Sequence, residues 1–146
     1  MIKTEQAYKE AVEKLKQDKL FIKEQTKKLE EMGLDPEHIE LAIQPYISFH
    51  EQLKEEVEYY EQIKRGEFTP VINLKMLGKT LIAYRIYIGM TQQELAAKLG
   101  VSPSQISRDE RNEYYGATIE RIQSVMEAMN MTSVTKIDPS DVIVSA

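Results

Sequence analysis

The sequence predicts an all-α protein in which a long antiparallel helical hairpin precedes a bundle of shorter helices. Apolar residues recur at helical spacing along most of the 146 residues. Ser, Thr or Asp stands where several helices would begin, and glycines stand where helices would end. β-Branched residues cluster near the C-terminus around Pro139, so one or two short strands are expected at 134–137 and 142–144.

The first helix is predicted over residues 4–32, and Gly33 provides its stop. Its apolar stripe recurs every seven residues at Tyr8, Leu15, Ile22 and Leu29.

A second helix is predicted from about Pro36 to Arg65, with Asp35 as its N-cap and Pro45 as an internal residue that can kink it. Both helices would be roughly 45 Å long at ~1.5 Å per residue, and the link at 33–35 is short, so we expect an antiparallel hairpin. Two helices alone cannot bury both apolar stripes. The hairpin therefore needs a third surface, which is the C-terminal part of the chain, a second copy or another protein.

Residues 66–70 are the clearest linker, and they divide the chain into two predicted domains. Residues 1–66 would be a hairpin for dimerisation or partner binding, and residues 67–146 would be a second domain. The net charge is −5, with 11 basic and 16 acidic residues in 1–70 and eight of each in 71–146. The second domain thus lacks the positive charge that is typical of nucleic-acid-binding proteins.

Four helices are predicted after the linker. The first would begin near Thr69 or Pro70 and end at Ile88, and the next two would cover 91–99 and 102–111. The last would run from Thr118 to about Met129, with Ile119 among its inward-facing residues.

Several classes of function lack the residues they need. The chain has no cysteine, no apolar stretch of about 20 residues and a polar, acidic start, so we expect a cytoplasmic protein. No phosphate-binding loop, nucleophile motif or acid–base pair is present, and His38 and His50 lack metal-ligand spacing. We therefore expect no enzymatic activity, no cofactor and no metal.

The most specific pattern lies in residues 91–110, TQQELAAKLGVSPSQISRDE. Ala96 is small enough for two helices to cross, Gly100 can turn the chain in the left-handed conformation, and Ser102 can cap the second helix. The outward positions of that helix carry side chains that are short or can hydrogen-bond, so a DNA duplex can approach closely.

At these residues the chain resembles the Cro/C1-type (XRE) helix-turn-helix family, over about residues 72–131. The pattern Thr-Gln-x-x-Leu-Ala-x-x-x-Gly-Val-Ser-x-Ser-x-Ile-Ser-x-x-Glu is present without a gap. Residues 107–114 also resemble the antitoxin branch of this family. The resemblance implies a five-helix, lambda-repressor-like domain that binds double-stranded DNA as a homodimer, with helix 102–111 in the major groove.

The resemblance also implies roles for single residues. Gln92 matches a position whose amide holds a phosphate, and Arg108 matches a position that faces base edges and can contact guanine. Pro103 departs from the family, which often has a hydrogen-bonding side chain there. The expected DNA-contacting residues are Gln92, Gln93, Lys98, Ser102, Pro103, Ser104, Gln105, Arg108, Arg111 and Asn112.

Arg85 and Glu110 match a buried ion pair of the family, for which the resemblance implies a structural role. An alternative to DNA contact for Arg108 is an ion pair with Asp109 or Glu110 on the protein surface. Three functions stay open: a sequence-specific repressor, an antitoxin that binds a toxin protein and represses its own operon, and an interaction module that uses the motif for packing alone.

Overall fold

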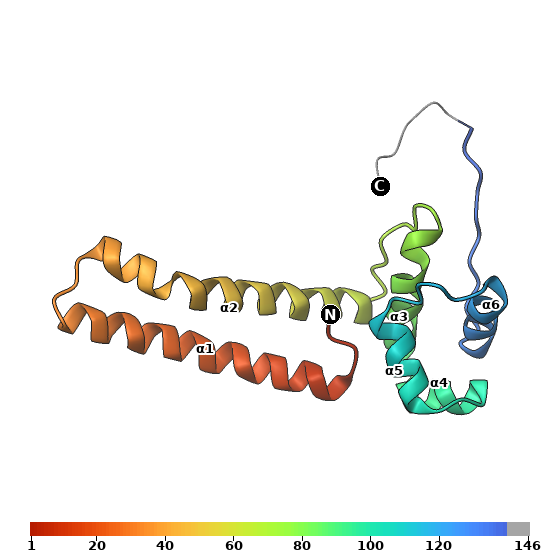
Figure 1. Cartoon of the computed structure of the whole chain (residues 1–146), viewed down its shortest axis with the longest axis horizontal. Coiled ribbons are helices and arrows are strands. Elements are labelled where there is room, and N and C mark those ends of the chain that lie inside the picture. The colour runs from red at the N-terminus through yellow and green to blue at the C-terminus, as the bar shows by residue number, and fades with distance from the viewer. Residues whose placement is uncertain (140–146) are drawn as a thin grey trace.

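A computed structural model describes residues 1–139 of the chain (Figure 1). Within this range the protein is all-α, with six α-helices, one 3-10 helix and no β-strand. Two long helices lie side by side and project from a group of shorter helices, which contains the motif of residues 91–110 (Figure 1). Across residues 1–139, no helix combines the length and apolar character that crossing a bilayer requires.

The predicted antiparallel hairpin is confirmed. Helix α1 covers Glu5–Glu31 and α2 covers Pro36–Lys64. Thr4 caps α1 by accepting a hydrogen bond from the Ala7 amide, and Asp35 caps α2 in the same way from His38. Gly33 has a φ of +79°, which places it in the left-handed conformation that lets the chain leave α1. Helix α2 continues through Pro45.

Four shorter α-helices follow the hairpin. They are α3 (Leu77–Tyr87), α4 (Gln92–Leu99), α5 (Pro103–Arg111) and α6 (Ile119–Ala128). A single 3-10 turn, η1 (Leu74–Met76), leads into α3. Residues 67–139 therefore contain four α-helices and this 3-10 turn, where the resemblance implies five helices.

Three local predictions are wrong. The helix expected from Thr69 or Pro70 begins at Leu77, because Asn73 has a positive φ of 64° with a ψ of 168°, and a helix cannot continue through that backbone conformation. Residues 134–137 form no strand, since no extended segment of residues 1–139 pairs with them. The strand expected at 142–144 lies outside the described residues. Ile119, the first residue of α6, faces solvent with 77% of its surface exposed.

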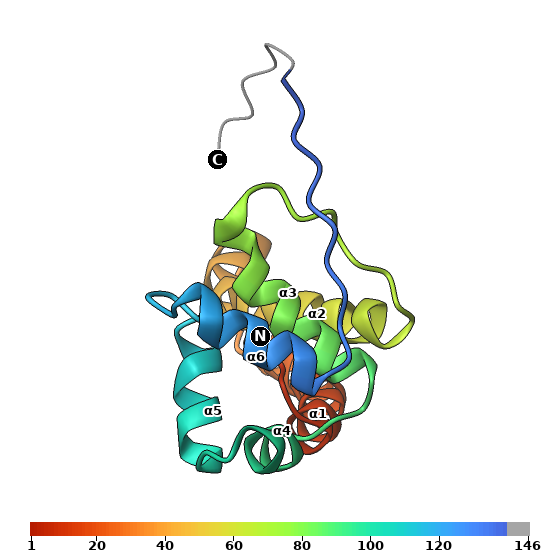
Figure 2. The same cartoon turned by 90° about the vertical axis from the view of Figure 1, so that its right-hand side faces the viewer.

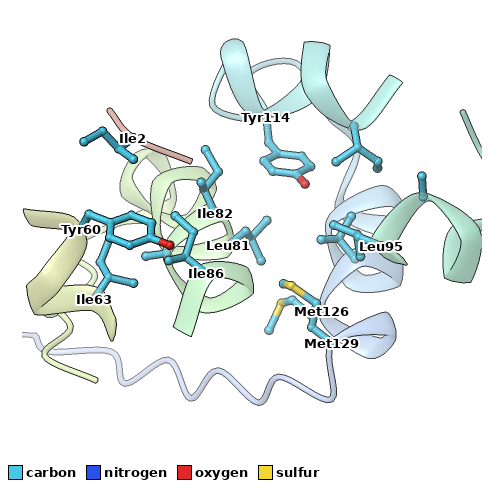
Figure 3. Packing of buried hydrophobic residues seen from close by; sticks show 14 of the residues in the cluster. Ile2, Tyr60, Ile63, Leu81, Ile82, Ile86, Leu95, Tyr114, Met126 and Met129 are labelled. Carbon is cyan, nitrogen blue, oxygen red and sulfur yellow. The ribbon is translucent and has the colours of Figure 1, made fainter. Parts of the chain in front are cut away.

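The base of the hairpin and the C-terminal helices share one hydrophobic cluster (Figure 3). Tyr60 and Ile63 of α2 lie beside Ile82 and Ile86 of α3, and Ile2 reaches the same region from the N-terminal segment (Figure 3). The cluster continues through Leu81 to Leu95, Ile106, Tyr114, Val125, Met126 and Met129. The boundary near residue 66 stays a prediction about folding, and the two parts it separates are in direct contact.

The far end of the hairpin is packed less completely than its base. Leu20 and Phe49 are 62% and 69% exposed, and the ring of Phe21 meets that of Tyr46 at a centroid distance of 5.3 Å. A groove of about 490 Å³ lies between the helices here and is lined by both rings together with Phe49 and Leu53. Part of the apolar stripe thus stays uncovered in the single chain.

Candidate nucleic-acid interface

Helices α4 and α5 and the turn between them form the candidate site. Thr91 and Glu94 make a reciprocal capping box at the start of α4, in which Glu94 Oε2 accepts from the Thr91 amide at 2.9 Å. Gly100 ends α4 with a φ of 67°, so the chain turns there in the left-handed conformation. Leu95 and Ala96 are buried where α4 meets its neighbours.

Helix α5 presents one face to solvent and the other to the core. Ser102 caps it by accepting from the Gln105 amide at 3.2 Å, and Pro103 occupies its first turn. Ile106 and Glu110 are buried. The exposed residues are Ser102, Pro103, Ser104, Arg108 and Arg111. Figure 2 shows α5 at one edge of the molecule, to one side of the hairpin.

Arg85 and Glu110 form the ion pair that the resemblance implies. Their side chains are 3% and 0% exposed, and Arg85 donates to Glu110 from Nε at 2.5 Å and from Nη2 at 2.9 Å. The guanidinium also donates to the carbonyl oxygens of Met90 and Lys3, each at 2.9 Å. The pair therefore ties α3 to the end of α5, to the turn before α4 and to the N-terminal segment.

Gln92 is held within the protein in this structure. Its Nε2 donates to Glu110 Oε2 at 2.7 Å, so the carboxylate that pairs with Arg85 also orients the first residue of α4. An amide nitrogen carries two hydrogens, and one of them is left for a phosphate. Gln93 beside it is exposed.

Arg108 pairs with neither Asp109 nor Glu110. Its Nη2 donates instead to Gln105 Oε1 at 3.1 Å. Asp109 accepts from Gln105 Nε2 and from Arg121 Nη2, both at 2.9 Å. Sequence reasoning missed Arg121, which stands on α6, twelve residues beyond Asp109, and no local pattern links the two.

Each acidic group of the motif has a hydrogen-bond partner within the protein, and Glu94 is the one that is exposed. Glu94 completes the capping box, Asp109 pairs with Arg121, and Glu110 pairs with Arg85. The basic side chains of Lys98 and Arg111 are exposed, and within residues 1–139 they make no hydrogen bond or ion pair. The exposed charge of the motif is therefore more positive than its composition suggests.

The loop after α5 packs tightly against α3. Glu113 and Tyr114 both adopt positive φ values, 51° and 58°, and Tyr114 is buried. A Cβ atom on Gly78 would lie 1.8 Å from the carbonyl oxygen of Glu113, so only glycine fits at that position of α3. Burial, followed by the nearby charges of Glu110 and Asp109, raises the pKa of the Tyr114 hydroxyl, which keeps it neutral.

Part of the chain matches a known protein family. Residues 81–137 match a family model described as helix-turn-helix. The matched segment includes α4, α5 and α6, and the hairpin lies outside it. The comparisons with curated proteins and with solved structures found no match.

Proposed function

We propose that this chain, whose residues 81–137 match a helix-turn-helix family model, is a sequence-specific transcriptional repressor of the Cro/C1 type that reads the major groove of DNA with α5. The observation that carries this proposal is the division of α5 into a buried face and an exposed face within the matched domain. Ile106 and Glu110 anchor the helix, while Ser104 and Arg108 point away from the core. A recognition helix must present such a free face to base edges.

The exposed residues suit two kinds of contact. Arg108 is the candidate for guanine, since an arginine can donate two hydrogen bonds to O6 and N7 of that base. Lys98, Arg111, Asn112 and the amides of Gln92 and Gln93 are the candidates for phosphates, which would place α5 in register without reading sequence. Ser102, Pro103, Ser104 and Gln105 complete the surface that faces the groove.

The distribution of charge supports DNA as the partner. Asp109 and Glu110 are paired with arginines of the protein, so the exposed charges of α4 and α5 are Glu94 and the three cations Lys98, Arg108 and Arg111. Phosphate contacts depend on the local charge that faces the duplex. The neutral composition of residues 71–146 is therefore compatible with binding.

A selection from randomised duplexes tests the proposal. The full chain should enrich one site, and titration against the enriched and a scrambled duplex at one stated salt concentration should show tighter binding to the first. If the protein binds as a homodimer, the site should be two-fold symmetric with half-sites about one DNA turn, ~34–36 Å, apart. Equal affinity for all duplexes would contradict the proposal.

An antitoxin is the second candidate, and the acidic charge of α2 beside the apolar groove of the hairpin favours it. Helix α2 carries seven acidic and two basic residues, and an apolar groove of about 490 Å³ lies between it and α1. An acidic surface with an apolar groove suits a basic protein partner such as a toxin. The same groove would also suit the hairpin of a second copy.

The hairpin of the purified full chain can be tested by its mass in solution. Phe49→Glu places a charge in the groove, and Ser48→Glu is the matched control, because Ser48 is exposed and does not line the groove. A dimer that Phe49→Glu alone converts to a monomer would place the homodimer contact in the hairpin. A mass that both variants leave unchanged would leave the groove free for another protein and favour the antitoxin.

A further inference from the structure

Four side chains form a continuous hydrogen-bonded chain that crosses from α5 to α6. It begins at the exposed Arg108, passes through Gln105 and Asp109, and ends at Arg121. The three links measure 3.1, 2.9 and 2.9 Å. Gln105, Asp109 and Arg121 are half-buried, so the chain runs from the exposed face of α5 into the junction between the two helices.

The chemistry of its neighbours allows one orientation of the Gln105 amide. Ionised Asp109 can only accept hydrogen bonds, and the guanidinium of Arg108 can only donate them. The amide must therefore direct Nε2 towards Asp109 and Oε1 towards Arg108. The reversed amide would face oxygen with oxygen and nitrogen with nitrogen, and it would lose both hydrogen bonds.

The start of α5 offers the Gln105 side chain a competing partner. Gln105 is the third residue of the helix after the Ser102 cap, and a glutamine at that position can reach back to the cap amide. Here its Nε2 reaches forward by one helical turn to Asp109 instead. Asp109 is itself held at its other oxygen by Arg121, which stands at the capped N-terminus of α6.

We infer that Asp109, held by Arg121, is a positioning residue for base recognition, because it orients the Gln105 amide and, through it, the guanidinium of Arg108. This inference rests on the proposed function of α5. Neither Asp109 nor Arg121 needs to touch DNA. The hydrogen-bonded chain fixes the positions of donors and acceptors on α5 before DNA binds, because it places the donors of Arg108 next to the acceptor Oε1 of Gln105. Such preorganisation lowers the entropy lost on binding.

The isosteric variant Asp109→Asn removes the preference for one amide orientation. An asparagine side chain can donate as well as accept, so the Gln105 amide can turn over. We expect discrimination between the preferred duplex and duplexes with single base-pair changes under Gln105 and Arg108 to fall by about threefold to tenfold, a part of what one bidentate contact supplies. Loss of a negative charge also strengthens phosphate contacts, but equally for every duplex.

A second pair of variants changes Arg121, the member of the hydrogen-bonded chain that lies on α6. Arg121→Met releases the other oxygen of Asp109 without changing α5, and it should reduce discrimination at the same base pairs. Arg121→Lys keeps a hydrogen-bond donor and a positive charge, so it should retain most of the discrimination between base pairs. The matched control is Glu120→Gln, which removes one negative charge from the exposed first turn of α6. Glu120 is not a member of the hydrogen-bonded chain. Thermal melting of each variant shows that it is folded.

The outcomes separate the inference from the proposed function. The inference is supported if Asp109→Asn and Arg121→Met both reduce discrimination at the same base pairs and Glu120→Gln does not. A different result would overturn the inference and leave the proposed function standing. In that case the wild-type protein discriminates among duplexes, but both variants change the affinity for all duplexes by the same factor. A wild-type chain without sequence preference would overturn the proposed function and the inference with it.

Discussion

Arg85 on α3 and Glu110 on α5 are joined by two hydrogen bonds in the interior of the protein, and both side chains are buried. The same carboxylate accepts from Gln92, and the same guanidinium donates to the Lys3 carbonyl. One ion pair thus connects both helices of the motif with the N-terminal segment that precedes the hairpin. Its loss should disturb the whole motif rather than one helix.

Arg85→Ala should lower the free energy of unfolding by about 3–5 kcal/mol, because it leaves the Glu110 carboxylate buried without its counter-charge. Urea or thermal unfolding of the variant measures this. The control is Arg65→Ala, which also removes an arginine from an ion pair. Arg65 and Glu67 are both more than half exposed, so this control should cost far less stability than Arg85→Ala, because solvent screens an exposed ion pair. Equal losses in the two variants would contradict a structural role for the buried pair.

Gly78→Ala should destabilise the protein by about 1–3 kcal/mol. The added Cβ would lie 1.8 Å from a backbone oxygen in the loop after α5, so helix and loop must separate. Helix propensity alone predicts the opposite sign, a gain of roughly 0.5–1 kcal/mol for alanine over glycine. The sign of the change in a denaturant titration therefore decides which effect dominates.

Arg108→Ala should weaken binding to the preferred duplex by about 1–3 kcal/mol and relax preference at one base pair, with thermal stability unchanged. Arg111→Ala is the matched control, since it is exposed on the same helix. We expect it to weaken binding to preferred and scrambled duplexes alike and to reduce the salt dependence. If Arg108→Ala behaves in that uniform way too, Arg108 contacts phosphate and not a base.

Features that depend on neighbours in sequence could be predicted. The caps of α1, α2, α4, α5 and α6 each lie next to the helix that they start, and Gly33, Gly89 and Gly100 adopt positive φ values where helices end. The motif is recognisable because its pattern is compact and gap-free.

Features that depend on distant residues could not be predicted from the sequence in this way. One local feature is missed as well: helical spacing of apolar residues predicts too early a start for α3, because the spacing continues into a segment where Asn73 has a positive φ of 64°. The partners of Asp109 and of the Lys3 carbonyl stand 12 and 82 residues away along the chain. Single-sequence patterns carry no information about such pairs, whereas the resemblance supplied the pairing of Arg85 with Glu110.

The last prediction concerns the boundary near residue 66. Because Tyr60 and Ile63 of α2 are buried in the cluster that also contains Leu81 and Ile82, their removal would leave apolar surface of α3 exposed to water. That exposure is unfavourable by about 25 cal/mol per Å². Removal of residues 1–66 also deletes the carbonyl of Lys3 that accepts a hydrogen bond from buried Arg85.

A fragment of residues 67–146 should therefore melt well below the full chain. A second variant, in which a short Gly/Ser linker replaces residues 20–47, keeps the base of the hairpin and deletes its far end. It should melt closer to the full chain than the fragment does, because the deleted residues lie outside the shared cluster. Circular dichroism melts of the three proteins at equal concentration provide the comparison. If the fragment melts with the full chain, residues 67–146 form an independently stable domain, and the contacts at the base of the hairpin contribute little to its stability.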